Sequence, residues 1–164
     1  MFRPRLTLLS ALALGACSTA AGPARHDDTI HAAGEIRFEI YQAANCEVVG
    51  PSPIGSCARG RYSGGFVGTG YYAIQKWEPL TPEGMVFVSE NEVLRLADGE
   101  LHGRVNAVFH NQSADREIAS LHTITGGTGR YAAASGYIRL WNGTGELVEY
   151  EAVIHLADTV AEAP

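Results

Sequence analysis

Residues 85–110, MVFVSENEVLRLADGELHGRVNAVFH, carry the clearest structural pattern in this chain of 164 residues. Apolar residues alternate with others along Met85–Leu96 and again along Leu101–His110, which is the period of a β-strand with one buried face. Between them, Ala97-Asp98-Gly99-Glu100 contains Asp-Gly, a strong signal for a tight hairpin. The stretch therefore predicts two neighbouring antiparallel strands.

The alternation continues on both sides of this hairpin, and no run of ten residues has a helical period. A second turn signal, Asn-Gly, lies in Asn142-Gly143-Thr144-Gly145. Closing the sheet would leave no exposed edge, so we expect residues 35–158 to form an all-β, eight-stranded antiparallel up-and-down barrel, with an open β-sandwich as the alternative. The predicted strands are Glu35–Gln42, Ala58–Phe66, Gly70–Glu78, Met85–Leu96, Leu101–His110, Arg116–Thr125, Ser135–Asn142 and Glu146–Leu156.

The N-terminus has the features of an export signal. Arg3 and Arg5 precede the apolar run Leu6–Leu14, which is about half of the roughly 20 residues that a membrane-spanning helix needs. The following Leu14-Gly15-Ala16-Cys17 resembles the lipobox of bacterial lipoproteins. The resemblance implies that residues 1–16 are a signal peptide and that Cys17 carries a lipid with palmitate-like chains, several of which anchor stably. A simple cleaved signal is the alternative.

Ser18, directly after the lipid cysteine, implies by the sorting pattern of bacterial lipoproteins a place at the periplasmic face of the outer membrane. Residues 17–34 are small and polar after Cys17, so we expect a flexible tether, and residues 159–164 form a C-terminal tail. Loss of Arg3 and Arg5 with the signal would lower the formal charge from −6 to −8, the wrong sign for a nucleic-acid binder.

Cys46 and Cys57 remain once Cys17 is assigned to lipid. An even pair in an oxidising compartment predicts a disulfide, here closing the loop EVVGPSPIGS. The alternative, a redox pair, is typically a Cys-x-x-Cys motif at the start of a helix, which this spacing does not provide.

The segment Gly126-Gly127-Thr128-Gly129-Arg130-Tyr131 superficially fits a dinucleotide-binding loop. The following strand-like residues come too soon for the helix that such a loop must open. The segment resembles instead the motif of allene oxide cyclase and dirigent-type barrels. That resemblance implies an eight-stranded barrel, often oligomeric, whose cavity in some members guides cyclisation or radical coupling of an apolar substrate. We expect Gly126, Gly127 and Gly129 to allow positive φ and close packing at a barrel corner.

Three polar residues fall in apolar registers: Glu90 and Glu92 on one strand and His122 on another. Inside a barrel a carboxylate is costly unless it is paired, and a buried Glu beside a His is suited to proton transfer. A bulge near residues 89–91 would instead place both glutamates in water, which is the arrangement we favour from the sequence. Candidate ligand contacts are the aromatic residues Tyr137, Trp141 and Tyr150, for which packing is the alternative role.

These features favour a lipid-anchored envelope protein that binds a small apolar molecule or an envelope component without chemistry of its own. One alternative is a cyclase-like enzyme using Glu90 or Glu92 with His122. Another is a protein-binding module, such as an inhibitor of an envelope enzyme. We expect no cofactor, no metal and no nucleic acid, and allow for a homo-oligomer. A cavity with a buried Glu and His would favour the enzyme. A dry apolar cavity would favour a protein that carries a small molecule, and a filled core would favour a protein-binding module.

Overall fold

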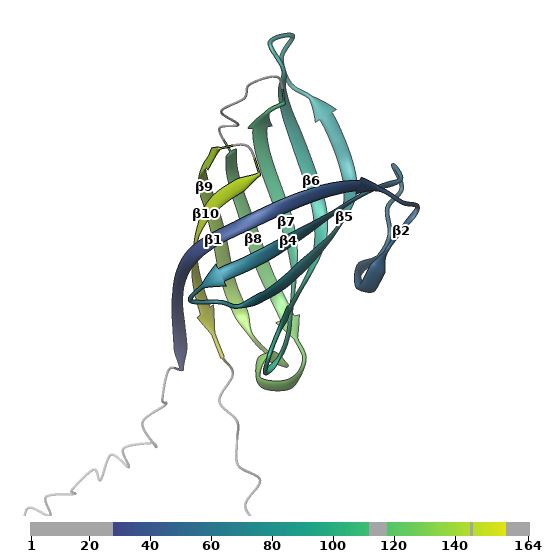
Figure 1. Cartoon of the computed structure of the whole chain (residues 1–164). Helices are drawn as coiled ribbons and strands as arrows, with labels where there is room; N and C mark the ends of the chain where they lie inside the picture. The colour runs from purple at the N-terminus through teal and green to yellow at the C-terminus, as the bar shows by residue number, and fades with distance from the viewer. Residues whose placement is uncertain (1–27, 112–117, 145, 157–164) are drawn as a thin grey trace, which may run out of the picture.

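A computed structural model describes residues 28–111, 118–144 and 146–156, and eight long strands dominate it (Figure 1). The predictions for residues 1–16, Cys17, the first part of the tether and the tail 159–164 lie outside the described residues. The barrel strands are β1 (Thr29–Gln42), β4 (Ser56–Gly64), β5 (Gly68–Pro79), β6 (Met85–Leu96), β7 (Gly99–His110), β8 (Ile118–Gly127), β9 (Ser135–Thr144) and β10 (Leu147–His155).

Each barrel strand pairs antiparallel with the next one along the chain, and β1 closes the circle by pairing with both β4 and β10. The predicted closed up-and-down barrel is confirmed, and the β-sandwich alternative is wrong. Closure gives every barrel strand a hydrogen-bonded neighbour on both sides, so the barrel has no open edge. The Asp-Gly hairpin is also confirmed, since Leu96 pairs with Gly99 across the turn.

Several predicted strand ends differ from the structure, most of them by one or two residues, and two of the differences change the interpretation of a segment. β1 begins at Thr29, so residues 29–34, expected in the tether, are strand. They pair with β10 from Thr29↔His155 onward, and the inward Ala32 is buried although its small side chain gives little hydrophobic signal. β9 continues to Thr144 instead of turning at Asn142. Asn142 has φ 52° and lies near a register shift between Leu147 and Glu149. The Asn-Gly pair is therefore part of an irregularity in the β9–β10 pairing, and not the turn of the hairpin.

The glycine-rich segment forms a corner, as predicted. Gly126 and Gly129 have φ of 148° and 57°, and a Cβ on Gly127 would lie 1.9 Å from the carbonyl oxygen of Glu100. The segment leads into a single 3₁₀ turn, η2 (Gly129–Tyr131), and then into β9, so it opens no nucleotide-binding helix.

The barrel interior differs between its two ends. At the end where β1 begins, large side chains that include Leu94, Leu101, Tyr131 and Ile154 fill the space. Toward the other end the inward residues are Phe38 of β1, Ala107 and Phe109 of β7, and Ile118 of β8, and they surround a hollow. Thr29 and η2 thus lie at the filled end, opposite the hollow (Figure 1).

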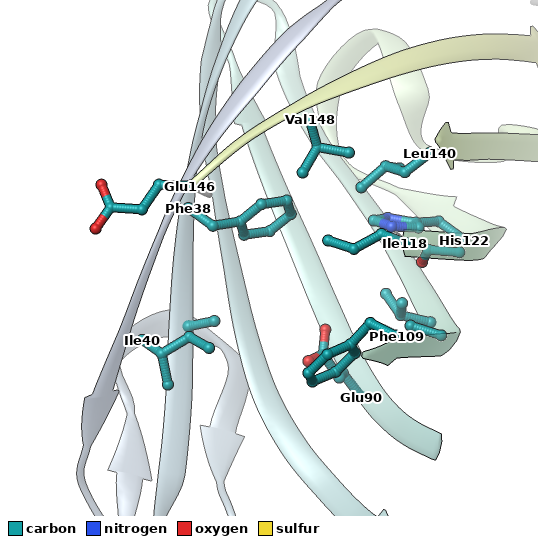
Figure 2. A pocket seen from close by; sticks show the side chains of 13 residues that line it. Phe38, Ile40, Glu90, Phe109, Ile118, His122, Leu140, Glu146 and Val148 are labelled. Carbon is teal, nitrogen blue, oxygen red and sulfur yellow. The ribbon is translucent and has the colours of Figure 1, made fainter. Parts of the chain in front are cut away.

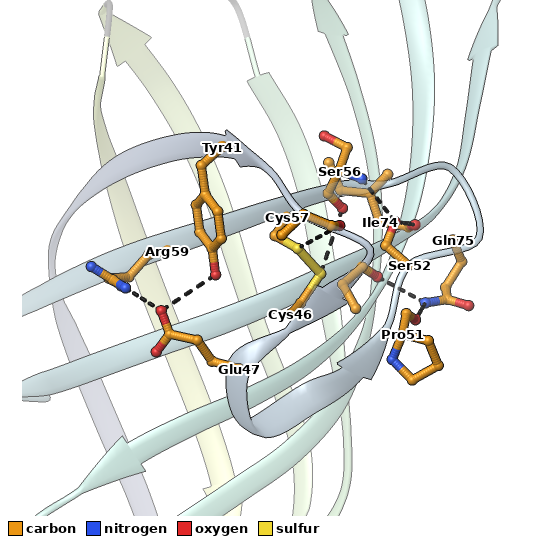
Figure 3. Close-up of a disulfide and its surroundings, with 12 residues drawn as sticks. Tyr41, Cys46, Glu47, Pro51, Ser52, Ser56, Cys57, Arg59, Ile74 and Gln75 are labelled. Carbon is orange, nitrogen blue, oxygen red and sulfur yellow. Dashed lines mark hydrogen bonds and ion pairs between the residues drawn. A yellow bond between two sulfur atoms is a disulfide. The ribbon is translucent and has the colours of Figure 1, made fainter.

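The predicted disulfide joins Cys46 and Cys57, and both residues are fully buried. It holds the connection between β1 and β4, which contains β2 (Asn45–Cys46), η1 (Glu47–Val49) and β3 (Gly50–Pro51), against Ala73 on the outside of β5 (Figure 3). Ser52 Oγ donates a 2.6 Å hydrogen bond to the carbonyl oxygen of Ile74. The disulfide therefore fastens a short outer flap to the barrel wall.

Within the described ranges, no helix has the length and apolar character needed to cross a membrane.

Candidate functional site

A cavity of about 300 Å³ lies inside the barrel at the end opposite Thr29 (Figure 2). Its walls are mostly apolar, and its polar lining residues are Glu90, Ser120, His122 and Glu146. Figure 2 shows the carboxylate of Glu146 pointing away from the cavity, so three polar side chains remain to face a guest. The other lining residues are Phe38, Ile40, Ala58, Val105, Ala107, Phe109, Ile118, Leu140 and Val148.

Glu90 and Glu92 both face the barrel interior. β6 keeps its alternation through residues 86–94, and Glu92 is only 2% exposed. The solvent-exposed placement favoured from the sequence is therefore wrong. An irregularity is present at this level, but it lies on the neighbouring strand, where β5 carries an extra residue between Ile74 and Lys76. β6 itself stays regular, so its inward register is not interrupted.

Glu92 lies at the centre of a buried polar network. His122 Nδ1 is 2.9 Å from Glu92 Oε2, and the Tyr62 hydroxyl donates to Glu92 Oε1 at 3.2 Å. The hydroxyls of Tyr62 and Tyr72 are 2.9 Å apart. Burial, followed by the charge of Glu92, raises the pKa of both tyrosines well above the usual value, so both stay neutral hydrogen-bonding groups.

This network fixes which nitrogen of His122 faces Glu92. A carboxylate only accepts hydrogen bonds, so Tyr62 donates to one oxygen of Glu92 and the Nδ1–H of His122 donates to the other. In the tautomer of His122 that carries its single proton on Nδ1, the Nε2 atom has a lone pair. His122 is 1% exposed and lines the cavity, and its Nε2 has no hydrogen-bond partner among the described residues.

Ser120 precedes His122 by two residues on the same face of β8, and its Oγ is likewise buried with no partner among the described residues. A buried polar atom without a partner costs about 1–3 kcal/mol, and two of them line one small cavity. The cavity wall therefore contains two buried hydrogen-bonding atoms that have no partner among the described residues.

Glu90 lies at the same height as His122, two strands away. Register pairs Glu90 with Val105 on β7 and Val105 with His122 on β8, so the three residues form one inward row. Burial raises the pKa of Glu90 from about 4.5 to about 7, opposed by the nearby His122 and reinforced by Glu92. Near neutral pH, Glu90 is present both as a carboxylic acid and as a carboxylate.

The sequence identified Glu90, Glu92 and His122, but it missed Tyr62, Tyr72 and Ser120. The two tyrosines share inward registers with apolar neighbours, and their spacing from Glu92 depends on β4, β5 and β6 lying side by side. Ser120 could have been found as the residue two before His122 in the same register.

The aromatic candidates lie outside the cavity. Tyr137 is 42% exposed on the outer surface, and Trp141 lies on the same face, with the guanidinium of Arg139 5.1 Å from its ring centre. Tyr150 is buried in the filled half, where its hydroxyl accepts a 2.7 Å hydrogen bond from the backbone N–H of Phe66. Tyr150 thus has the packing role that the sequence gave as the alternative, whereas Tyr137 and Trp141 lie on the outer surface.

Across the described ranges, no group of three or more His, Cys, Asp or Glu side chains is arranged to hold a metal ion. Comparisons of the chain with protein-family models, with curated proteins and with solved structures found no match.

Proposed function

We propose that this protein is a lipid-anchored barrel of the bacterial envelope that binds a small, largely apolar molecule in its cavity. The observation that carries the proposal is the Nε2 atom of His122, which is buried without a partner on the wall of a hollow. A protein interior rarely keeps such an atom unsatisfied, and a ligand would supply the missing hydrogen bond. The cavity volume lies at the lower end of the range, about 300–1,000 Å³, that is typical of small-molecule sites.

The lining indicates the chemistry of this ligand. Its body would contact Phe38, Phe109, Leu140 and Val148, and its polar end would lie near Glu90, Ser120 and His122. His122 Nε2 accepts a hydrogen bond, Ser120 donates or accepts, and protonated Glu90 donates. We therefore expect one hydroxyl or carbonyl group on an otherwise apolar molecule.

Native mass spectrometry of protein purified from its own envelope tests this proposal, with a pair of alanine variants as controls. Ala107→Phe places a ring inside the cavity, whereas Ala119→Phe adds the same ring on the exposed face of β8. We expect a co-purifying small molecule in the wild type and in Ala119→Phe, and its loss in Ala107→Phe. Folded wild-type protein that carries no small molecule, and binds none from envelope extracts, would contradict the proposal.

A second candidate is an enzyme of the cyclase-like class. The specific observation in its favour is that Glu90 and His122 line the same cavity, the arrangement that we expected of an enzyme. The resemblance of the glycine motif to allene oxide cyclase and dirigent-type barrels also supports it. A protein-binding module has less support because we expected it to have a filled core. A homo-oligomer stays a prediction.

A further inference from the structure

Two groups able to exchange protons face one another across the upper part of the cavity. Glu90 and His122 flank Val105 in a single inward row, so their Cα atoms are separated by about two strand spacings, roughly 10 Å. Both side chains line the hollow (Figure 2). A functional group bound over Val105, which lines the same cavity, would lie near both side chains.

The two groups are held in complementary roles. Glu92 accepts the Nδ1–H of His122, and in the neutral ring the unpartnered Nε2 atom is then the one that can act as a general base. Glu92 would also stabilise the imidazolium that forms when Nε2 takes a proton, which makes it a positioning residue. Glu90 forms no ion pair among the described residues, and its protonated form can donate to an oxygen atom.

We propose that the cavity catalyses keto–enol proton transfer on a small, largely apolar ketone or aldehyde, with His122 as base and Glu90 as acid. This inference rests on the proposed binding function and adds a reaction to it. His122 Nε2 removes a proton from the carbon next to the carbonyl, and that C–H electron pair forms the C=C bond of the enol. The C=O π pair takes the proton of Glu90.

The reverse transfers restore both residues, so the cycle needs no oxidant, reductant or cofactor. The imidazolium returns a proton to carbon, and the enol hydroxyl returns one to the Glu90 carboxylate. If the proton on the imidazolium is replaced by one from solvent before the return to the original carbon, the net result is hydrogen exchange. If the molecule is unsaturated and the proton returns two atoms further on, the double bond shifts and the product is an isomer.

Deuterium exchange tests the inference without knowledge of the natural substrate. The full-length protein is mixed in D₂O at neutral pH with 4-alkylcyclohexanones of increasing chain length, and binding and deuterium content are followed by NMR and mass spectrometry. We expect ketones that bind to exchange their α-hydrogens at least tenfold faster than in buffer, since acid–base groups contribute about 10²–10⁴-fold.

The variants assign the two roles. His122→Gln can still donate to Glu92, but it removes the base, and Glu90→Gln keeps the shape but cannot give up a proton. Both should bind the ketone and reduce exchange by tenfold or more. His102→Gln, on the outer face of β7 beside Glu100, should leave the rate unchanged.

The possible failures are distinguishable. Ketones that bind to the wild type but exchange at the buffer rate overturn this inference while the binding function stands. Unchanged exchange in folded His122→Gln and Glu90→Gln also overturns it. Failure of the whole ketone series to bind overturns the inference, whereas the proposed function fails only if the envelope-purified protein is also empty.

Discussion

Glu92 shows how a carboxylate is accommodated at the centre of a small barrel. Both of its oxygens accept hydrogen bonds, one from Tyr62 and one from His122, in a layer between the filled half and the cavity. Gly103 lies directly opposite on β7, where a Cβ would be only 3.3 Å from Glu92 Oε2. The missing side chain at Gly103 therefore gives the carboxylate the room that it needs beside His122.

The raised pKa of Glu90 predicts a distinct dependence of stability on pH. Below about pH 4.5 Glu90 is protonated in both states and carries no penalty. Between pH 4.5 and 7 the unfolded chain releases its proton first, so the folded state loses stability as the pH rises, by at most about 3 kcal/mol above pH 7. Burial is the largest cause of the raised pKa, and His122 and Glu92 act on it in opposite directions.

Glu90→Gln should remove this loss. Relative to wild type, we expect its free energy of unfolding to increase between pH 4 and pH 8 by up to about 3 kcal/mol, measured by urea denaturation at each pH. Glu83→Gln, outside the cavity lining, serves as the control and should show no such change. A constant difference between Glu90→Gln and wild type across this range would contradict the raised pKa.

Three residues of the site could be predicted from alternation alone, but their environment and the tyrosines that contact them could not. Glu90, Glu92 and His122 stand in apolar registers, and the structure keeps them there. The bulge that we expected to turn the glutamates outward lies instead on β5, at Gln75, and a strand's own sequence does not show where its neighbour carries an extra residue. The hydrogen bonds from Tyr62 to Glu92 and from His122 to Glu92 likewise depend on pairing between strands.

Among the elements, the corner at the end of β8 leaves almost no room for a side chain. A Cβ on Gly127 would lie 1.9 Å from the carbonyl oxygen of Glu100, a backbone atom fixed by β7. Gly127→Ala should therefore destabilise the fold by about 3 kcal/mol, at the upper end of overpacking effects, as measured by chemical denaturation.

Gly55→Ala is the matched comparison. Gly55 has φ 67° and open space around its Cα, so an added Cβ meets only backbone strain of about 1–2 kcal/mol. Equal effects of the two substitutions would show that the corner yields more easily than its packing suggests.

Strand identity followed well from sequence, whereas strand ends did not. The stretch from Met85 to His110 shows strict alternation with a turn signal, and β6 and β7 fall where predicted. Residues 29–34 contain only one large apolar residue, Ile30, so the sequence predicts a tether there. They form a strand because they pair with β10, which is far away in the sequence. Such long-range pairing cannot be recognised from the residues of the segment itself.

At the scale of the whole molecule, the closed barrel followed from counting strands, but its hollow did not. Closure removes exposed edges, whatever the side chains inside. Whether an interior is filled depends on the summed volume of inward residues at each height. Here Ala58, Ala107 and Ser120 are small where the cavity lies, while Tyr131 and Tyr150 fill the other end.

The proposed lipid anchor makes a prediction for the intact cell. Labelled fatty acid should enter the full-length protein, and Cys17→Ala should abolish that labelling and release the barrel into the soluble envelope fraction. Cys46→Ala is the control, because Cys46 is joined to Cys57 and takes no lipid. Labelling that persists unchanged in Cys17→Ala would contradict the anchor.

The position of Thr29 has a consequence for how guests would arrive. The strand that follows an anchored Cys17 starts at the filled end, and residues 18–28 can span at most about 40 Å even when fully extended. A barrel tied in this way would be connected to the bilayer through its filled end, and its cavity would lie at the opposite end. Molecules would then reach the cavity from the aqueous side or from another surface that faces the cavity. Molecules that diffuse sideways out of the anchoring leaflet would not arrive at the opening.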